Sequence, residues 1–567
     1  MKATKFRERR DQYYVQWMVC LVVRGNCQYY FYPRRDDLND CEVERMTAIP
    51  ELTAAYTIAA IAGLGGMLVF CFILGLVARR RASSYDTYMV GKREMGPFIT
   101  GCAISSTYLS GWATMGMMGI TYAVGWSGMW FAGVWTIFGI VPTIFLAARK
   151  LSDFSARNNT RTLGDIARVR YDSKIASTFV ATAMALMMFA YAVGQLKAAG
   201  TLWYAVTGLS PFWCLLFAVL VVLVYLIIGG YTATQWAMGF QGILLGIACF
   251  VLGILALKFV GGAGAMEARL AAEDPNLLML VRPDLPRVGT NQLFSDMIGV
   301  SSTLLLFFSM STGMPHNVAR FLGMRQMKKK MDFIWLILPV FAIAGFPIML
   351  NAVTGLCARA TFGTALFDIL PWKGDLAAPF MAMAAGGVGM STLYVTGVFA
   401  ATLSTFSGMI LIIAGNIAND IIGTWSPNIS PRSLLLLNRI LLVPVALVPF
   451  IWTLYNPPEL LALLTGQAAA GFGGMFLPTI TLGLWWRRAT KEGAIACVTY
   501  GLLTTILFSY LVGKNIMGMG WAIWLIVLGS LICYVVGSLL SKPLPKEKLD
   551  EILGPVAPAK GATVSAE

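Results

Sequence analysis

The sequence is poor in charge and almost without histidine. Only 13% of its 567 residues are charged, whereas soluble proteins carry about a quarter. With 57% hydrophobic residues, the chain cannot cover itself with polar surface, so we expect its solvent to be lipid. The only histidine is His316, and no Ser/His/Asp set suggests hydrolysis. The composition therefore excludes a soluble hydrolase.

Motifs of nucleotide and metal chemistry are also missing. There is no GxxxxGK[ST] loop, so the sequence predicts no nucleotide-hydrolysing domain. Seven of the ten cysteines lie in or beside apolar runs, where cysteine behaves as a small hydrophobe, and no CxxC spacing occurs. The net charge of +15 is spread over separated loops rather than one face. We therefore expect no enzymatic activity, no cofactor and no nucleic-acid partner.

Apolar runs long enough to cross a bilayer recur along most of the chain. A span needs about 20 apolar residues, and we count thirteen such runs between residues 54 and 541. The sequence therefore predicts an all-α polytopic membrane protein with about 13 transmembrane helices. The two sets of alternate loops hold 25 and 6 lysines and arginines. The positive-inside rule makes the richer set cytoplasmic, which places the N-terminus outside and the C-terminus in the cytoplasm.

The two ends of the chain do not fit this pattern. Residues 1–45 have mixed charge, and their apolar stretch is too short to span a membrane. The predicted orientation would also place this basic segment outside, against the charge rule. We expect Met46 to be the initiator and 1–45 to be a mis-assigned start; a real extracellular tail is the alternative. The Pro- and Ala-rich residues 542–567 are expected to form a disordered cytoplasmic tail.

An oxygen-rich stretch lies inside one apolar run. "ISSTYLSGW" carries the hydroxyls of Ser105, Ser106, Thr107, Tyr108 and Ser110, with no charge among them. Irregular backbone inside a membrane is tolerated only around a cavity or site, and transporters break helices there to aim carbonyls at a cation. The stretch therefore predicts a broken helix at an ion site. The alternative is a plain helix whose hydroxyls bond back to the preceding turn.

Two further features extend this prediction. "AATLSTFSGMILIIAGNIANDI" gathers hydroxyls, including those of Ser404 and Thr405, in one turn of another span. In "STGMPHNVARFLG", Pro315 and His316 interrupt the end of a span just before Arg320. We expect these three residues to mark a helix break used in gating. His316 either fixes the backbone there or acts as a proton switch.

Five motifs in order resemble the sodium/solute symporter family over about residues 83–500. They are "YMVGKREMGPFITGCAISSTYLSGW", "RTLGDIARVRYDSK", "LIIGGYTATQWAMGFQG", "GMPHNVARF" and "LGLWWRRATKEGA". The motifs are most similar to the pantothenate, monocarboxylate (acetate) and proline branches. The resemblance implies a LeuT-like core of two inverted five-helix repeats, expected at 98–260 and 293–486. Residues 46–97 would then be an outer helix with a cytoplasmic loop, and 487–541 peripheral C-terminal helices.

The resemblance also implies where sodium and solute bind. One sodium in the family lies between the broken helix and a later one. By that resemblance, the carbonyls of Ser106 and Leu109 would face Ala401, Ser404 and Thr405. The expected solute-pocket residues are Thr107, Tyr108, Ser110, Gly111, Trp112, Gln195 and Lys197.

Two of these expectations carry alternatives or departures. Lys197 either snorkels to the outer end of its span or contacts a substrate carboxylate. Relatives carry core carboxylates where this chain has Thr107–Tyr108 and Met238. Little in the core can therefore titrate, which argues for sodium rather than proton coupling.

We predict a secondary active transporter that imports a small organic monocarboxylate with sodium by alternating access. The alternative is a sodium-coupled symporter for an amino acid such as proline; a membrane solute sensor or a passive channel would be a different class. The expected partners are the solute, sodium as the coupling ion and the lipid bilayer, with no obligate protein partner. The expected location is the plasma membrane, which in a bacterium is the inner membrane.

Overall fold

The structure is a computed structural model that describes residues 50, 53–79, 89–369, 373–426, 428–455 and 461–555. The predictions for 1–45 and for the chain beyond residue 555 lie outside these residues. Within the described ranges the chain forms helices and connections, with two isolated β-bridges and no strand. The predicted all-α class is confirmed.

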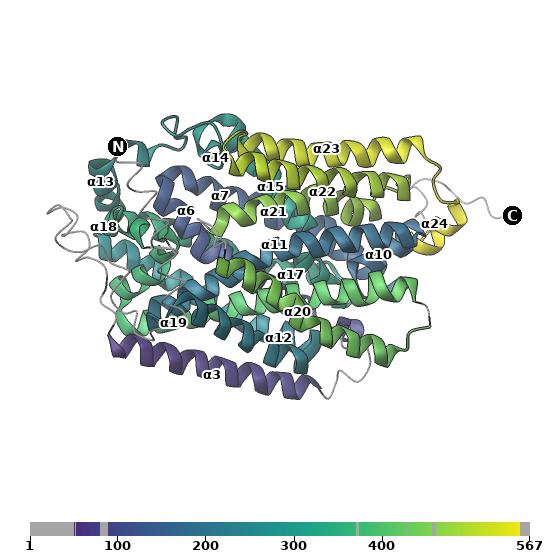
Figure 1. The fold of residues 1–567 in the computed structure, drawn as a ribbon, viewed down its shortest axis with the longest axis horizontal. Coiled ribbons are helices and arrows are strands. Elements are labelled where there is room, and N and C mark those ends of the chain that lie inside the picture. Colours follow the sequence, from purple (N-terminus) through teal and green to yellow (C-terminus); the bar gives the residue numbers. More distant parts are fainter. Residues whose placement is uncertain are drawn as a thin grey trace.

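The fold is a bundle of long helices, many of them interrupted (Figure 1). The longest are α3 (Ala54–Arg79), α11 (Lys174–Thr207), α12 (Pro211–Val260), α19 (Ala377–Gly415), α20 (Pro431–Tyr455), α22 (Lys491–Gly513) and α23 (Met519–Leu540). The shorter α-helices are α5 (Pro97–Tyr108), α6 (Met117–Val124), α7 (Met129–Val134), α8 (Val141–Thr143), α9 (Arg149–Asn158), α10 (Leu163–Tyr171), α13 (Ala263–Glu273), α14 (Gln292–Ser295), α15 (Met297–Gly313), α16 (Pro315–Val318), α17 (Lys330–Val340), α18 (Phe346–Phe362), α21 (Leu461–Phe476) and α24 (Lys546–Leu553).

Short π and 3-10 segments connect or interrupt these helices. The π segments are η3 (Trp112–Gly116), η5 (Trp135–Ile140), η6 (Ile144–Ala148), η9 (Phe341–Gly345), η12 (Asn416–Gly423) and η13 (Leu477–Thr481). The 3-10 segments are η2 (Gly91–Arg93), η4 (Gly125–Gly128), η7 (Pro275–Leu278), η8 (Ala319–Gly323), η10 (Ala365–Asp368), η11 (Lys373–Leu376) and η14 (Leu482–Leu484). π segments inside α-helices are frequent at functional sites.

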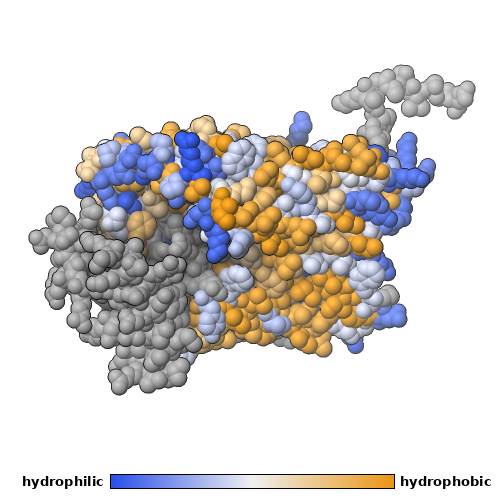
Figure 2. Space-filling view, turned by 45° about the horizontal axis from the view of Figure 1, so that its top comes forward, coloured by the Kyte–Doolittle hydropathy of each residue, from blue (hydrophilic) through white to orange (hydrophobic). Residues whose placement is uncertain are grey.

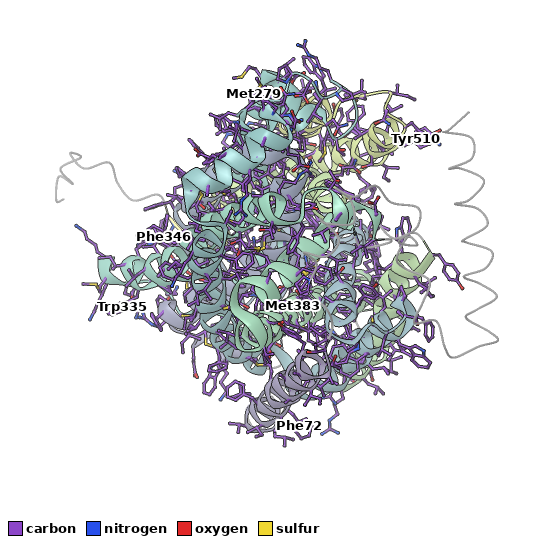
Figure 3. The ribbon with its side chains drawn as sticks, turned by 90° about the vertical axis from the view of Figure 1, so that its left-hand side faces the viewer. Phe72, Met279, Trp335, Phe346, Met383 and Tyr510 are labelled. Atoms are coloured by element: carbon purple, nitrogen blue, oxygen red, sulfur yellow. The ribbon has the colours of Figure 1, made fainter. Side chains whose placement is uncertain are left out.

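The flank of the bundle is apolar between two polar ends. Figure 2 shows a broad hydrophobic surface with hydrophilic residues gathered toward the ends. Phe72, Trp335, Phe346 and Tyr510 are exposed on the outside of the bundle, whereas Met383 is buried among the helices (Figure 3). Large exposed apolar side chains suit a lipid solvent. The surface therefore agrees with the membrane location that the composition predicts.

The number of spans follows only in part from the structure. Nine of the described helical stretches are long and apolar enough to cross a membrane. The pair α15–α16, bent by 45°, makes ten if it is counted as one span. α5 alone is too short to qualify, whereas α6 is counted within the stretch Trp112–Asn158. The total of about 13 spans stays a prediction.

The two ends of the bundle carry different elements. The end with α10 and α24, which we call the basic end, lies at the right of Figure 1. The opposite end carries α13 and is called the α13 end. α11 starts beside α10 and runs toward the α13 end, whereas α19 runs the other way and continues into η12, which contacts α10.

The prediction of a disordered tail over 542–567 is wrong for 546–553, which form α24. Asn158 of α9 donates to the Ile552 carbonyl at 3.0 Å, and Arg487 forms an ion pair with Asp550. Partners elsewhere in the fold therefore order a charged segment that has no long apolar run of its own.

Gly125 provides a test of the packing at the α13 end. It ends α6 at φ 71° and ψ −145°, a conformation open to glycine, and a Cβ would overlap the Leu277 carbonyl. Gly125→Ala should therefore lower the free energy of unfolding by about 1–3 kcal/mol, measured on the purified protein in detergent. Gly133→Ala is the control, because a Cβ there meets open space. An equal fall in both variants would contradict the prediction.

Candidate functional site

α5 ends within the oxygen-rich stretch. Leu109 takes φ −78° and ψ 46°, outside the helical region, and the helical path resumes at Gly111. The Leu109 N–H still donates to the Ser105 carbonyl at 2.8 Å. A helix end leaves its last carbonyls without helical donors. Leu109 therefore lies at a break, and the plain-helix alternative does not hold here.

The hydroxyls before the break are used in two ways. Ser105 donates to the Gly101 carbonyl at 2.8 Å, and Thr107 donates to the Ala103 carbonyl at 3.0 Å. The Ser106 hydroxyl is also buried, but it has no hydrogen-bond partner among the described residues. A buried polar group without a partner requires a water, an ion or a functional explanation. The buried Tyr108 hydroxyl likewise has no hydrogen-bond partner among the described residues, so Ser106 and Tyr108 are the hydroxyls of this turn that remain open to a ligand.

One turn of α19 gathers three oxygen atoms. The Ala401 carbonyl accepts hydrogen bonds from the Ser404 hydroxyl at 2.8 Å and from the Thr405 hydroxyl at 2.9 Å. All three residues are buried. Ser407 likewise donates to the Ser404 carbonyl at 2.8 Å. The hydroxyls donate to carbonyls of their own helix, as serine and threonine do in apolar surroundings. Their oxygen atoms carry no formal charge, and their lone pairs remain available at one turn of α19.

α11 and α19 meet the chain at the break. The Gly111 N–H donates to Oε1 of Gln195 on α11 at 3.2 Å, and the Ser110 carbonyl accepts from the Thr114 hydroxyl at 2.9 Å. A Cβ at Gly111 would lie 3.2 Å from the Thr402 hydroxyl of α19. Nε2 of Gln195 and the Thr402 hydroxyl are buried and have no hydrogen-bond partner in the part of the chain that the structure describes. Two segments therefore bring open polar groups to one glycine.

The aromatic residues of the stretch pack into a ring cluster. The Trp112 ring lies 4.8 Å from that of Trp135 and 5.6 Å from that of Phe307. The Tyr108 ring lies edge-on to Trp135 at 5.6 Å. Both Tyr108 and Trp112 are buried. This cluster forms a rigid wall beside the break.

A second break follows in the later half of the chain. α15 and α16 meet at 45°, with Pro315 as the first residue of α16. The His316 ring is buried 5.4 Å from the Tyr191 ring of α11. Nη1 of Arg320, in η8, donates to Oε1 of Gln235 on α12 at 3.2 Å. The interrupted segment therefore contacts both α11 and α12.

Lys197 does not snorkel, which corrects one of the two expectations for this residue. It is fully buried, and its Nζ lies 2.6 Å from Oδ2 of Asp375 in η11. Asp375 is only 2% exposed, and a Cβ at Gly119 of α6 would lie 2.9 Å from its Oδ1. The connection between α18 and α19 thus folds inward over α6 and α11. Its carboxylate, rather than solvent, balances the buried ammonium.

Sequence reasoning missed Thr402 and Asp375. Thr402 stands two residues before Ser404, so its hydroxyl was visible within the same motif. Asp375 lies in a connection rather than a span, and its pairing crosses 178 positions of the chain. The signal that could have found it is the need of the buried Lys197 for an acid.

Comparison with known proteins adds to this geometry. The model of the sodium:solute symporter family matches residues 88–501. The osmoregulated proline transporter OpuE of Bacillus subtilis (strain 168) is 24% identical over 80% of this chain and 89% of its own length. The sodium/proline symporter of Escherichia coli (strain K12) is 26% identical over 78% of this chain and 87% of its own length.

The fold has counterparts among solved structures. A Na+-coupled sialic acid symporter in a substrate-bound outward-open state matches with a TM-score of 0.66 and 16% identity, over 87% of this chain and 100% of that chain. The predicted LeuT-like fold is confirmed. The boundaries of its repeats stay predictions.

The ion pair can be tested by unfolding. Lys197→Met should lower the free energy of unfolding by about 3–5 kcal/mol, because it leaves a buried carboxylate unbalanced. The double variant Lys197→Met with Asp375→Leu should recover most of that loss. Lys491→Met is the control, because Lys491 pairs with Glu492 at an exposed position. If the single and double variants unfold alike, the pair does not act as described.

Proposed function

Because the chain belongs to the sodium:solute symporter family, we propose that it carries a proline-like zwitterionic amino acid across the membrane together with sodium. Its relatives are named as proline transporters, and the chain covers 87–89% of the length of the two described above. They favour the amino-acid alternative over the monocarboxylate expected first. Both solutes carry a carboxylate, so the difference between them is the added ammonium.

The proposed sodium site lies between the break and α19. The observation that carries it is the meeting of an interrupted helix with a turn that gathers neutral oxygens. The carbonyls of Ser106 and Leu109 would supply one half, and Ala401, Ser404 and Thr405 the other. Neutral oxygen ligands of this kind replace the hydration shell of an alkali ion. The contact of α19 with α5 and η3 supports this assignment.

The proposed solute pocket lies beside the sodium site, around Gly111. Gln195 and Thr402 bring polar atoms there that lack partners among the described residues, and Trp112 forms part of the adjoining aromatic wall. Sodium binding would hold α19 against the break and so complete the pocket. Solute and sodium then favour each other's binding, and by linkage they do so reciprocally.

The Lys197–Asp375 pair is the proposed barrier toward the α13 end. It ties η11 to α11 on the side of the break away from α10. Opening toward that end would require this pair to separate or move as a unit. We assign the basic end to the cytoplasm by the positive-inside rule, with the α13 end outside. The N-terminus would then be outside and the C-terminus inside, in a bacterial inner membrane.

Transport itself tests the function. Purified protein in proteoliposomes should accumulate radiolabelled proline above the external concentration when sodium is imposed outside, and should not do so with potassium alone. Acetate offered in place of proline should accumulate far less. Equal movement of proline with and without a sodium gradient would fit a passive channel and overturn the proposal.

The sodium site is tested by removing its hydroxyls. Ser404→Ala with Thr405→Ala should raise the half-saturating sodium concentration for uptake at least about tenfold, since a hydrogen-bonding group on a charge contributes about 1.5–3 kcal/mol. Thr392→Ala is the matched control, because its hydroxyl donates to Val388 in the same helix, away from the break. An unchanged sodium requirement in the double variant would place the ion elsewhere.

A further inference from the structure

A cavity of about 50 Å³ lies on the basic-end side of the break. α19, η8, η12, α12 and the segment between α9 and α10 all contribute to its described lining. Gly408 of α19 lines it and stands one helical turn after Ser404 in the direction of the basic end. The cavity is therefore the next space along α19 after the candidate sodium site.

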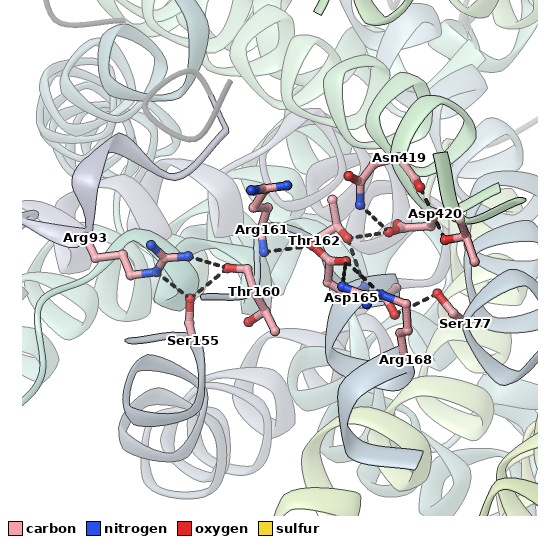
Figure 4. Close-up of polar contacts among 12 residues, drawn as sticks. Arg93, Ser155, Thr160, Arg161, Thr162, Asp165, Arg168, Ser177, Asn419 and Asp420 are labelled. Carbon is pink, nitrogen blue, oxygen red and sulfur yellow. Dashed lines mark hydrogen bonds and ion pairs between the residues drawn. The ribbon is translucent and has the colours of Figure 1, made fainter. Parts of the chain in front are cut away.

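Two arginines line this cavity. Nη2 of Arg320 comes 3.0 Å from the Cβ position of Gly408, so the guanidinium lies against α19. Arg161 lines the cavity from the α9–α10 segment. Its backbone N–H donates to Asp165 at 3.1 Å, while its side chain points away from that carboxylate (Figure 4). Among the described residues that line the cavity, none is acidic.

The carboxylates nearby are held by other donors. Asp420 accepts from the Thr162 hydroxyl and from the Asn419 amide, each at 2.7 Å (Figure 4). Asp165 forms an ion pair with Arg168 at 3.0 Å. Neither carboxylate belongs to the cavity lining. Within the described lining, the two arginines are therefore the charged side chains, and the partly buried setting strengthens their interaction with an ion in the cavity.

Asn416 points independently to a ligand. It lines the cavity and is fully buried, and neither atom of its side-chain amide has a hydrogen-bond partner in the described parts of the chain. Buried amides in folded proteins are normally satisfied by protein or by ordered ligand. The amide nitrogen can donate to anions, and the same lining contains two arginines, whose guanidinium groups can only donate.

The size of the cavity limits what can enter it. A volume of about 50 Å³ holds roughly three to five waters, at about 10–15 Å³ for each. That is room for the three heavy atoms of a carboxylate but not for a whole amino acid. The remainder of a bound solute would have to extend back toward the break.

We propose that this cavity is a second carboxylate subsite, formed by Arg161, Arg320 and Asn416, through which the solute leaves toward the basic end. The inference rests on the proposed function for the identity of the solute. The carboxylate moves one turn along α19, from the pocket at the break to the guanidinium groups. Arg161 belongs to the connection between α9 and α10, at the end of the proposed path. It passes the carboxylate on to solvent.

A cysteine in the cavity tests the subsite without requiring transport. Ile412 lines the cavity and is half-buried, so Ile412→Cys places a thiol there. In the detergent-solubilised full chain, a negatively charged methanethiosulfonate should react at least tenfold faster than a positively charged one of similar size. The parent chain, with its ten cysteines, supplies the background rate. Acetate and proline should protect the thiol, whereas prolinamide, which lacks the carboxylate, should not.

Variants assign the protection to named side chains. Asn416→Leu and Arg161→Gln, each in the Ile412→Cys background, should raise the protecting concentration of acetate about tenfold. Arg149→Gln is the control, because it removes an exposed charge that pairs with Asp153 in the α9 helix. In right-side-out vesicles, Asn416→Leu should raise the half-saturating proline concentration for efflux about tenfold, whereas Arg149→Gln should leave it within twofold.

Several results would overturn the subsite. They are equal reaction of the two reagents, protection by chloride but not by acetate, protection by prolinamide equal to that by proline, and protection unchanged in both lining variants. Protection by acetate without protection by proline would overturn its assignment to the transported solute. Absence of sodium-driven proline uptake would instead overturn the proposed function. The thiol-modification experiment does not depend on transport, so it tests the subsite independently of the proposed function.

Discussion

The satisfaction of backbone oxygens in a medium without water constrains the whole structure. A helix can be interrupted in lipid only where other groups take over its hydrogen bonds or where a ligand does. In this chain the interruption falls at Leu109, and Gln195 meets the N–H of Gly111 directly after it. Asn351 meets the Ala113 carbonyl at 3.3 Å within η3. Among the polar atoms near the break that have no partner in the described residues are Nε2 of Gln195 and the Thr402 hydroxyl, and we assign these two to the solute pocket.

The local features of the site could be predicted from the sequence, and the distant pairings could not. Clustered hydroxyls with Gly111 favour a break at Leu109, and Pro315 favours one after α15, because the physical cause lies within a few residues. Asp375, the partner of Lys197, lies in a connection whose path depends on the packing of α6 and α18. No local sequence pattern therefore predicts this pair. α24 was missed for the same reason, since contacts with Asn158 and Arg487 order it. Asn416 reads as one more residue of an apolar helix until the cavity beside it is seen.

Positive groups flank the break on both sides. Lys197 lies toward the α13 end and is balanced by Asp375. Arg320 and Arg161 lie toward the basic end beside Asn416. A solute that carries a carboxylate therefore has a cation of the protein ahead of it and behind it along the proposed path. The lysine has a carboxylate 2.6 Å away, and Arg320 donates to Gln235 at 3.2 Å.

The oxygens of Ala401, Ser404 and Thr405 carry no formal charge, and this has an electrical consequence. A site of that kind contributes no fixed charge of its own when it is empty, so any response of the unloaded carrier to voltage would come from other groups, such as the charged residues that flank the break. When loaded with one sodium and a zwitterion, the same site holds one net positive charge. A potential of 100 mV acts on that charge with about 2.3 kcal/mol if it crosses the full field. The resting potential would then act on the charge that sodium brings to the site, because hydroxyls and a carbonyl do not cancel it.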